Sequence, residues 1–355
     1  MRRPAKKLAG VVSPPSACMT LLSYLLRRLV GFAAVMIGIS IITFALSHVV
    51  PADPAIVALG DHATDAQIEA FREKYGLNKP VPEQYWIYVT NLLQGDLGIS
   101  LRTRRPVAED LRNFFPATFE LSLTALVFSI LIGIPSGVVS ATARNRLPDH
   151  VVRLLSLIGG SVPIFWLGLI LIGFFYGRLG WLPGGARIDK FIPPPPEVTG
   201  LFTVDSLLAG DYKAFGSSIQ HLFLPALALG YFSTAIIARM MRSSMLEVLN
   251  QQYVLAARAK GLGQGLVVWR HAARNALIPT VTTIGVTFGS LLSGAVLTET
   301  IFSWPGLGRY ATSSAINLDF PAVMGVTLLA ALVYTLTNLI VDLGYQWLDP
   351  RIRHG

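Results

Sequence analysis

Positions 121–143 of this 355-residue chain read LSLTALVFSILIGIPSGVVSATA, without one charged side chain. About 20 apolar residues in a helix cross the roughly 30 Å hydrocarbon core of a bilayer. Such a segment must be helical, because each backbone N–H and C=O in hydrocarbon needs a partner within the protein. Five further stretches are also long and apolar, with Arg153 as the one Asp, Glu, Lys or Arg among them: 29–50, 151–176, 222–238, 277–297 and 322–341. The pattern predicts an all-α, polytopic membrane protein with about six transmembrane helices.

The composition points to the same class. Hydrophobic residues make up 52% of the chain and charged residues only 14%, and the mean hydropathy is +0.55. Soluble domains carry about 25% charged residues. The net charge of +9 suits a membrane protein, in which basic residues collect in cytoplasmic loops. No nucleic-acid-binding motif accompanies these bases, so we expect no nucleic-acid partner. The single cysteine, Cys18, can form neither an internal disulfide nor a metal cluster.

Lys and Arg indicate the orientation. When the N-terminus is placed in the cytoplasm, the inner segments hold most of the bases and few acids. Both termini are therefore expected to be cytoplasmic. The predicted organisation is a tail (1–28), a first transmembrane helix (29–50), an extracytoplasmic segment (51–116), a transport domain of five helices (117–345) with a cytoplasmic loop (241–276), and a tail (346–355). Met1 and Met19 both stay open as the start, since a cleaner segment begins at Met19.

Two local patterns refine this organisation. The extracytoplasmic segment contains helix-like stretches at 64–75, with Thr64 or Asp65 as the cap, and at 84–93. Within the spans, glycines four residues apart allow two helices to approach closely. Small or kinking residues of this kind occur in the second and third spans: Gly133, Gly137, Gly159, Gly160, Pro163 and Gly168. They predict helix packing and local kinks, and a role in lining a transport pathway stays open.

The loop 241–276 is the most informative soluble part. Residues 253–260 are rich in good helix formers, and Gly261 follows them as a helix-ending residue. A second helical piece at 266–275 leads to Pro279 at the membrane. Small residues in the first piece suit close approach to another protein: Ala256, Ala257 and Ala259.

Basic residues in the same loop leave two interpretations open. They are Arg258, Lys260, Arg270 and Arg274. They can pair with acids around a partner's groove, or they can meet lipid phosphates while an amphipathic loop rests on the headgroups. The residues alone do not decide between these interpretations.

The loop resembles the cytoplasmic signature of binding-protein-dependent ABC importer permeases. Ala256, Ala257 and Gly261 match its spacing, whereas Leu255 stands where the general signature has Glu. That departure, and the late Pro279, are similar to the peptide/nickel branch of the family, which Tyr253 and the stretches 257–262 and 270–279 also match. Further landmarks cover the chain from Leu21 onward: 51–54, 75–77, 95–100, 242–249, 297–309 and 341–353.

The resemblance is closest to the B-type permease subunits of bacterial dipeptide and oligopeptide importers. It implies a type I importer fold in the inner membrane, which carries peptides by ATP-driven alternating access. The implied partners are a second, C-type permease, two ABC ATPases that use ATP and Mg, and an extracytoplasmic peptide-binding protein. No cofactor is expected on this chain itself. The residues that would contact the ATPase are Tyr253, Ala256, Ala257, Arg258, Lys260, Gly261 and Leu262.

A second group of candidates lies after the fifth span. Glu299, Trp304 and Pro305 could form part of a transport pathway or an outer gate. Alternatively, Glu299 anchors the turn before Gly306, and this is the interpretation we favour, because a carboxylate at a membrane boundary must be solvated or paired. For Glu120, His48 and Asp342, all at span ends, solvation at the interface is the expected explanation.

Several other functions find little support. No phosphate-binding loop of the Gly-x-x-x-x-Gly-Lys-Ser/Thr type occurs, so ATP hydrolysis is assigned to separate subunits. No histidine has the spacing of a metal site, and no catalytic set is evident. An ion-gradient-driven transporter would place ionisable residues near the membrane midplane, and the spans lack them. Within the family, nickel, glutathione or another small solute stays open as the substrate.

Overall fold

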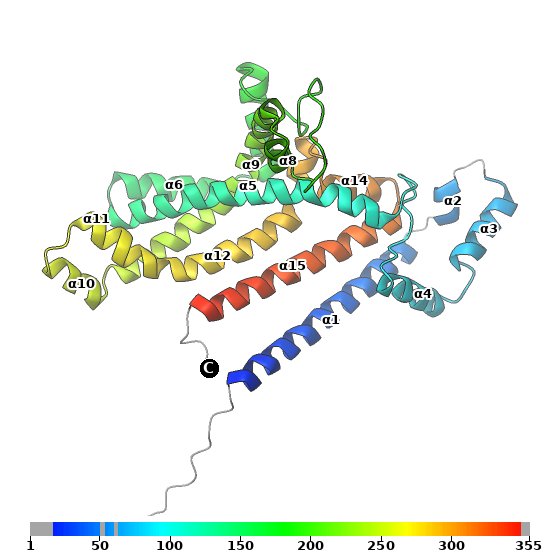
Figure 1. Ribbon diagram of the computed structural model, residues 1–355, viewed down its shortest axis with the longest axis horizontal. Coiled ribbons are helices and arrows are strands. Elements are labelled where there is room, and N and C mark those ends of the chain that lie inside the picture. The colour runs from blue at the N-terminus through cyan, green and yellow to red at the C-terminus, as the bar shows by residue number, and fades with distance from the viewer. Residues whose placement is uncertain (1–16, 50–53, 60–62, 349–355) are drawn as a thin grey trace, which may run out of the picture.

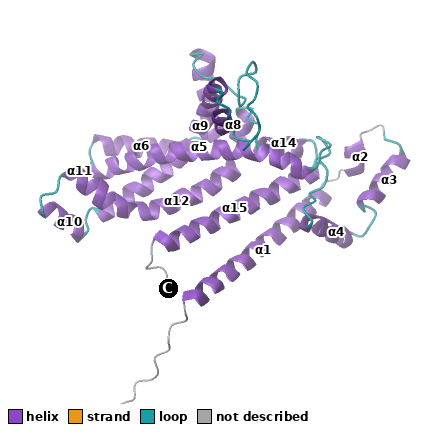
Figure 2. Cartoon of the chain, in the orientation of Figure 1, coloured by secondary structure: helices purple, strands orange, loops and turns teal. Residues whose placement is uncertain are grey.

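The computed structural model describes residues 17–49, 54–59 and 63–348. Over those ranges the regular structure is helical (Figure 2), apart from one isolated bridge between Ile99 and Pro106. Within these described ranges, five helices are long and apolar enough to cross a membrane, and a bent pair raises the number to six. The predicted all-α, polytopic fold is confirmed.

The helices, in chain order, are α1 (Ala17–Val49), α2 (Pro54–Leu59), α3 (Asp65–Tyr75), α4 (Val81–Leu93), α5 (Val107–Thr142), α6 (Leu147–Ser161), α7 (Ile164–Leu171), η1 (Ile172–Arg178), α8 (Phe202–Leu208), α9 (Tyr212–Val248), α10 (Gln252–Ala259), α11 (Gln264–Leu266), η2 (Val267–Ala272), α12 (Ala273–Gly294), α13 (Val296–Ile301), α14 (Leu307–Ile316) and α15 (Phe320–Leu348). The two segments labelled η are π-helical.

The packing of α5 against α9 forms the centre of the bundle. Glycines bring the two backbones together: a Cβ added to Gly137 would lie 2.7 Å from the carbonyl oxygen of Ala238. A Cβ on Gly230 would lie 2.7 Å from the carbonyl oxygen of Ala125 in the same way. Gly133 also lies against α9. The prediction that Gly133 and Gly137 serve helix packing is therefore confirmed.

The third predicted span is broken. Helix α6 ends at Ser161, α7 begins at Ile164, and the two meet at an angle of 106°. Pro163 precedes the first residue of α7, where a proline is tolerated because the N–H it lacks has no intrahelical partner. Hydropathy at 151–176 predicted a single crossing, so the bend is a departure from that expectation, whereas the kink predicted from Pro163 is confirmed.

Two other helices extend beyond the spans that they contain. Helix α5 begins at Val107, inside the predicted extracytoplasmic segment, and α9 continues to Val248, past the predicted start of the loop 241–276. Hydropathy identifies only the stretch that suits hydrocarbon, and polar helical turns can continue on either side. In the segment before α5, Thr64, one of the two predicted caps, is the N-cap of α3 and forms a capping box with Gln67. Helix α4 covers the second expected helix.

Figure 1 shows how the ends of the molecule differ. Helices α10 and α11 lie at one end, and α2 to α4 lie at the opposite end. Helix α1 packs along α15, which in turn packs along α12. The ends of α1 and α15 nearest the chain termini both point away from α2 to α4. The loop between α9 and α12 therefore lies away from the segment that was predicted to be extracytoplasmic.

Candidate functional site

The loop 241–276, which we call the coupling loop, has a short helix and a sharp turn. Helix α10 ends at Ala259, and Gly261 follows with a φ of +77°. From Gln264 the chain stays helical through η2 and into α12. The helix and its end at Gly261 were predicted correctly. The piece predicted at 266–275 is not separate, because it forms the beginning of the long helix that passes Pro279.

The inner face of α10 is buried in a hydrophobic cluster at the ends of three long helices. Val254 and Ala257 join one hydrophobic cluster with residues from α5, α9, η2 and α12: Val138, Ala141, Met241, Met245, Val248, Val267, Val268, Ala272, Ala273 and Ala276. Ala257 is only 8% exposed. Its side chain faces the core of this chain, and the expectation that it opens onto a partner's groove does not fit that placement.

Tyr253 braces α10 against the helix that follows the turn. Its hydroxyl accepts a hydrogen bond from the side-chain amide of Asn275 at 2.5 Å and donates one to the carbonyl oxygen of His271 at 3.3 Å. Sequence reasoning selected Tyr253 through the family signature alone and gave it no partner. Asn275 belongs to the same signature, and the structure pairs the two residues.

The outer face of α10 is exposed and mixed in character. Leu255 is 52% exposed, and Ala256, Arg258 and Lys260 are exposed beside it. Exposed apolar groups followed by two cations suit a groove with an acidic rim. At Gly261 an added Cβ would meet no atom within 4 Å, so the turn needs glycine for its positive φ and not for room.

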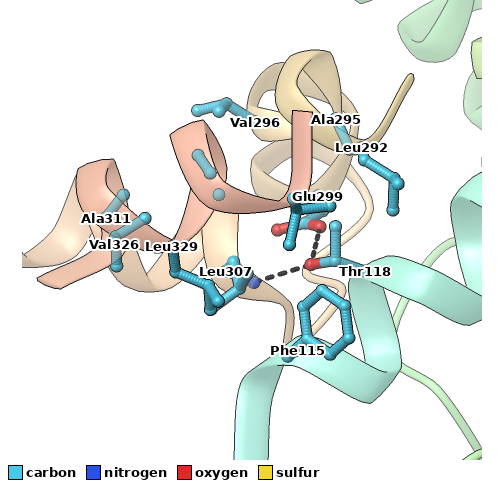
Figure 3. Close-up of a pocket in the computed structure, with 13 residues that line it drawn as sticks. Phe115, Thr118, Leu292, Ala295, Val296, Glu299, Leu307, Ala311, Val326 and Leu329 are labelled. Atoms are coloured by element: carbon cyan, nitrogen blue, oxygen red, sulfur yellow. Dashed lines mark hydrogen bonds between the residues drawn. The ribbon is translucent and has the colours of Figure 1, made fainter. Parts of the chain in front are cut away.

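The second group of candidates lies in the α13–α14 turn, residues 296–309, shown in Figure 3. Glu299 is fully buried there. Its Oε1 accepts a hydrogen bond from the Thr118 hydroxyl at 2.6 Å, and its Oε2 accepts one from the backbone N–H of Arg309 at 3.0 Å. Arg309 lies in the first turn of α14, where the helix dipole favours negative charge. Glu299 therefore caps α14 and holds it against α5.

Two opposing influences act on the Glu299 carboxyl. Burial raises its pKa to about 7, while hydrogen bonds from Thr118, Arg309 and Gly308 favour the charged form and act in the other direction. The same Thr118 hydroxyl also accepts the N–H of Leu307 at 2.8 Å (Figure 3). The carboxyl thus sits inside a network of donors, beside a cavity of about 50 Å³ lined mainly by apolar residues.

Trp304 contributes to the same anchoring. Its side chain is 1% exposed, and its indole N–H donates to the carbonyl oxygen of Ala117 at 2.8 Å. Pro305 follows and leads into Gly306, where an added Cβ would collide with the Glu299 carboxylate. The structure brings Glu299, Trp304 and Pro305 together, and the contacts of Glu299 and Trp304 favour the anchor interpretation.

Sequence reasoning missed a buried ion pair close to this turn. Arg187 donates to Glu120 Oε2 through Nη2 at 2.6 Å and through Nε at 3.0 Å, and both side chains are buried. The Arg187 guanidinium also lies 3.8 Å from the ring centroid of Phe202. Solvation at the interface, expected for Glu120, is therefore wrong. The side chains of His48 and Asp342 lie outside the described part of the chain.

A bundle of apolar helices of this length is the architecture of a polytopic membrane protein. The family model of binding-protein-dependent transport system inner membrane components matches residues 133–354. The model of the N-terminal part of such membrane components matches residues 21–124. The chain belongs to this family, and it is the multi-pass inner membrane component of an ABC importer.

Named relatives are similar over nearly their whole length. The chain is 50% identical over 337 residues to the "Probable D,D-dipeptide transport system permease protein" of Escherichia coli (strain K12), which covers 95% of this chain and 99% of the relative. It is 46% identical over 335 residues to the di/tripeptide transport system permease protein of Pseudomonas aeruginosa (strain UCBPP-PA14), with 94% and 99% covered. A glutathione transport system permease protein of Escherichia coli O6:H1 (strain CFT073) is 37% identical over 334 residues, with 94% and 100% covered.

Proposed function

We propose that this chain is one of two permease subunits that move dipeptides or short oligopeptides into the cell by ATP-driven alternating access. A second, homologous permease, two cytoplasmic ATPases and an extracytoplasmic peptide-binding protein complete the importer. The ATPases bind ATP and Mg, and this chain is non-catalytic. Both termini and the coupling loop lie in the cytoplasm.

The observation that carries this proposal is the two-sided character of α10. Its inner face is fixed to the bundle through Val254 and Ala257, and its outer face leaves Leu255, Arg258 and Lys260 exposed. A helix seated in a groove of an ATPase moves when the ATPases close. Helix α10 packs on η2, which continues into α12, and it shares one hydrophobic cluster with the ends of α5 and α9. That displacement therefore reaches the spans as a rigid-body movement.

The relatives favour peptides as the cargo. Two relatives whose names refer to peptides of two or three residues are 50% and 46% identical to this chain, whereas the glutathione relative is 37% identical. Uptake of a labelled dipeptide into proteoliposomes that contain the complete importer tests the proposal. We expect uptake to require ATP and to persist when ion gradients are collapsed. Uptake that follows the gradient and ignores ATP would show a secondary transporter instead.

Crosslinking tests the docking of α10 at single-residue resolution. In a Cys18→Ser background, we expect a cysteine at the exposed Leu255 to crosslink to an ATPase subunit of the complete importer. A cysteine at the neighbouring Ala257 is the matched control, and its burial predicts little or no crosslink. Equal crosslinking at both positions, or capture of lipid alone at Leu255, would contradict the docked arrangement.

A further inference from the structure

A second ion pair lies at the start of the coupling loop, and the functions described above do not use it. Its carboxylate is buried, and its arginine side chain is 22% exposed. Asp149, in the first turn of α6, is completely buried. Arg242, on α9, donates to its Oδ1 through Nε at 2.8 Å and to its Oδ2 through Nη2 at 2.9 Å. Two parallel hydrogen bonds between a guanidinium and a carboxylate set distance and direction together.

The same carboxylate also connects α5 to this pair. The Ser140 hydroxyl, in the last turns of α5, donates to Asp149 Oδ1 at 2.6 Å. The backbone N–H of Asn145, in the turn between α5 and α6, donates to Oδ2 at 2.9 Å. Asn145 itself has a φ of +60°, in the left-handed region. Asp149 thus joins the end of α5, the turn, the start of α6 and α9 at one point.

Arg242 lies near the end of α9, the helix that leads directly into α10. Helix α9 ends at Val248 and α10 begins at Gln252, so the connection between them is short. Met241 and Met245, on either side of Arg242, are buried in the cluster that also holds Val254 of α10. A displacement of α10 therefore acts on the same turns of α9 that carry Arg242.

Helix α6 extends from this point toward the α13–α14 turn. It ends at the 106° bend, and α7 follows. Gly168 of α7 lies against Phe302, because an added Cβ would be 3.2 Å from its ring. Further along α6, Gly159 packs against Ala235 of α9, where an added Cβ would lie 3.0 Å from the Ala235 Cβ. At its start, Asp149 holds α6 to α9 through a charged contact of fixed geometry.

We propose that Asp149 and Arg242 are a positioning pair, which makes α6, and through its bend α7, move together with α9 when the coupling loop is displaced. The inference rests on the proposed function, since it concerns how movement of the coupling loop reaches the outer end. Apolar surfaces can slide over one another at little cost, whereas a bidentate ion pair resists sliding because its two hydrogen bonds require one geometry.

The test compares coupling with assembly in the complete importer. Peptide imported per ATP hydrolysed is measured in proteoliposomes for the wild type, Arg242→Met and the double variant Asp149→Asn/Arg242→Met. Arg242→Met alone leaves a buried carboxylate unpaired, so we expect poor assembly. The double variant removes both charges, and we expect it to assemble. Its ratio of peptide to ATP should nevertheless fall about five-fold, within the range that coupling positions show.

Two further variants make the outcome decisive. Arg153→Met, which removes an exposed arginine of α6, the helix that carries Asp149, should leave the ratio of peptide imported to ATP hydrolysed unchanged. Arg242→Lys keeps the charge but loses the paired hydrogen bonds, and it should assemble normally with a reduced ratio. A wild-type ratio of peptide to ATP in the assembled double variant overturns the proposal. If the double variant does not assemble, a wild-type ratio in Arg242→Lys overturns it instead. Loss of ATP dependence in the wild type would instead contradict the proposed function.

Discussion

The coupling loop and the α13–α14 turn both carry family signatures, but they differ in where their side chains point. In the coupling loop, α10 buries one face and leaves Leu255, Arg258 and Lys260 outside. In the turn, Glu299 and Trp304 are buried and bonded to α5. A signature can therefore record an exposed surface or a set of internal contacts, and only the burial of each side chain separates the two.

The largest effect that can break this comparison is expected at Trp304. Truncation of a buried tryptophan costs about 3–5 kcal/mol, and Trp304→Ala also removes the hydrogen bond to Ala117. We expect poor assembly and a low unfolding temperature in detergent. Trp181→Ala is the matched control, because Trp181 is 70% exposed and should tolerate the change. If Trp304→Ala is stable but does not transport, Trp304 belongs to a pathway and not to an anchor.

The next effect concerns the pH dependence at Glu299. Its pKa is about 7 in the folded protein and 4.5 without perturbation. The folded state therefore binds the proton more tightly, so the stabilisation is complete below about pH 4.5 and is lost as the pH rises through about 7. Unfolding temperatures of the wild type in detergent should fall between about pH 5 and pH 8 relative to those of Glu299→Gln. Parallel curves for the two proteins would show that the carboxyl stays ionised throughout.

The smallest of the three effects is local to Gly261. A left-handed conformation costs an L-residue about 1–2 kcal/mol, so Gly261→Val should distort the turn and reduce peptide-stimulated ATP hydrolysis without preventing insertion. Gly261→Asn should be milder, because Asn tolerates this conformation. Gly263→Ala is the control, since that glycine has an ordinary φ and open space around it. Equal peptide-stimulated ATP hydrolysis by all of these proteins would show that the turn at Gly261 has no role in coupling.

Much of the fold could be predicted because its signals are local. An apolar stretch such as 121–143 carries its own evidence for a span, and Thr64 followed by Gln67 predicts a helix cap. The helix of the coupling loop and its end at Gly261 follow from neighbouring residues in the same way. The bend between α6 and α7 is different. Pro163 predicts a kink, but the helix after the bend packs against residues far away in the chain, such as Phe302 beside Gly168.

The buried charges could not be predicted for the same reason. The partners of Glu120 and Asp149 lie 67 and 93 residues away, and no sequence spacing relates such positions. Both acids stand near span ends, where solvation explains an isolated carboxylate equally well. Ala257 shows a different limit of the sequence. Its small side chain suits either a partner's groove or the core of its own chain, and only the packing around α10 shows which of the two surrounds it.

Gly261 has a consequence for the chirality of the turn. No atom lies within 4 Å of the place where its side chain would begin, so the position is roomy and yet unsuited to most L-residues. A D-amino acid prefers positive φ, and D-alanine introduced by chemical synthesis of this segment would fit the space without strain. The turn thus selects for the handedness of the residue and not for its size. D-alanine at position 261 would hold α10 in place more firmly than glycine does.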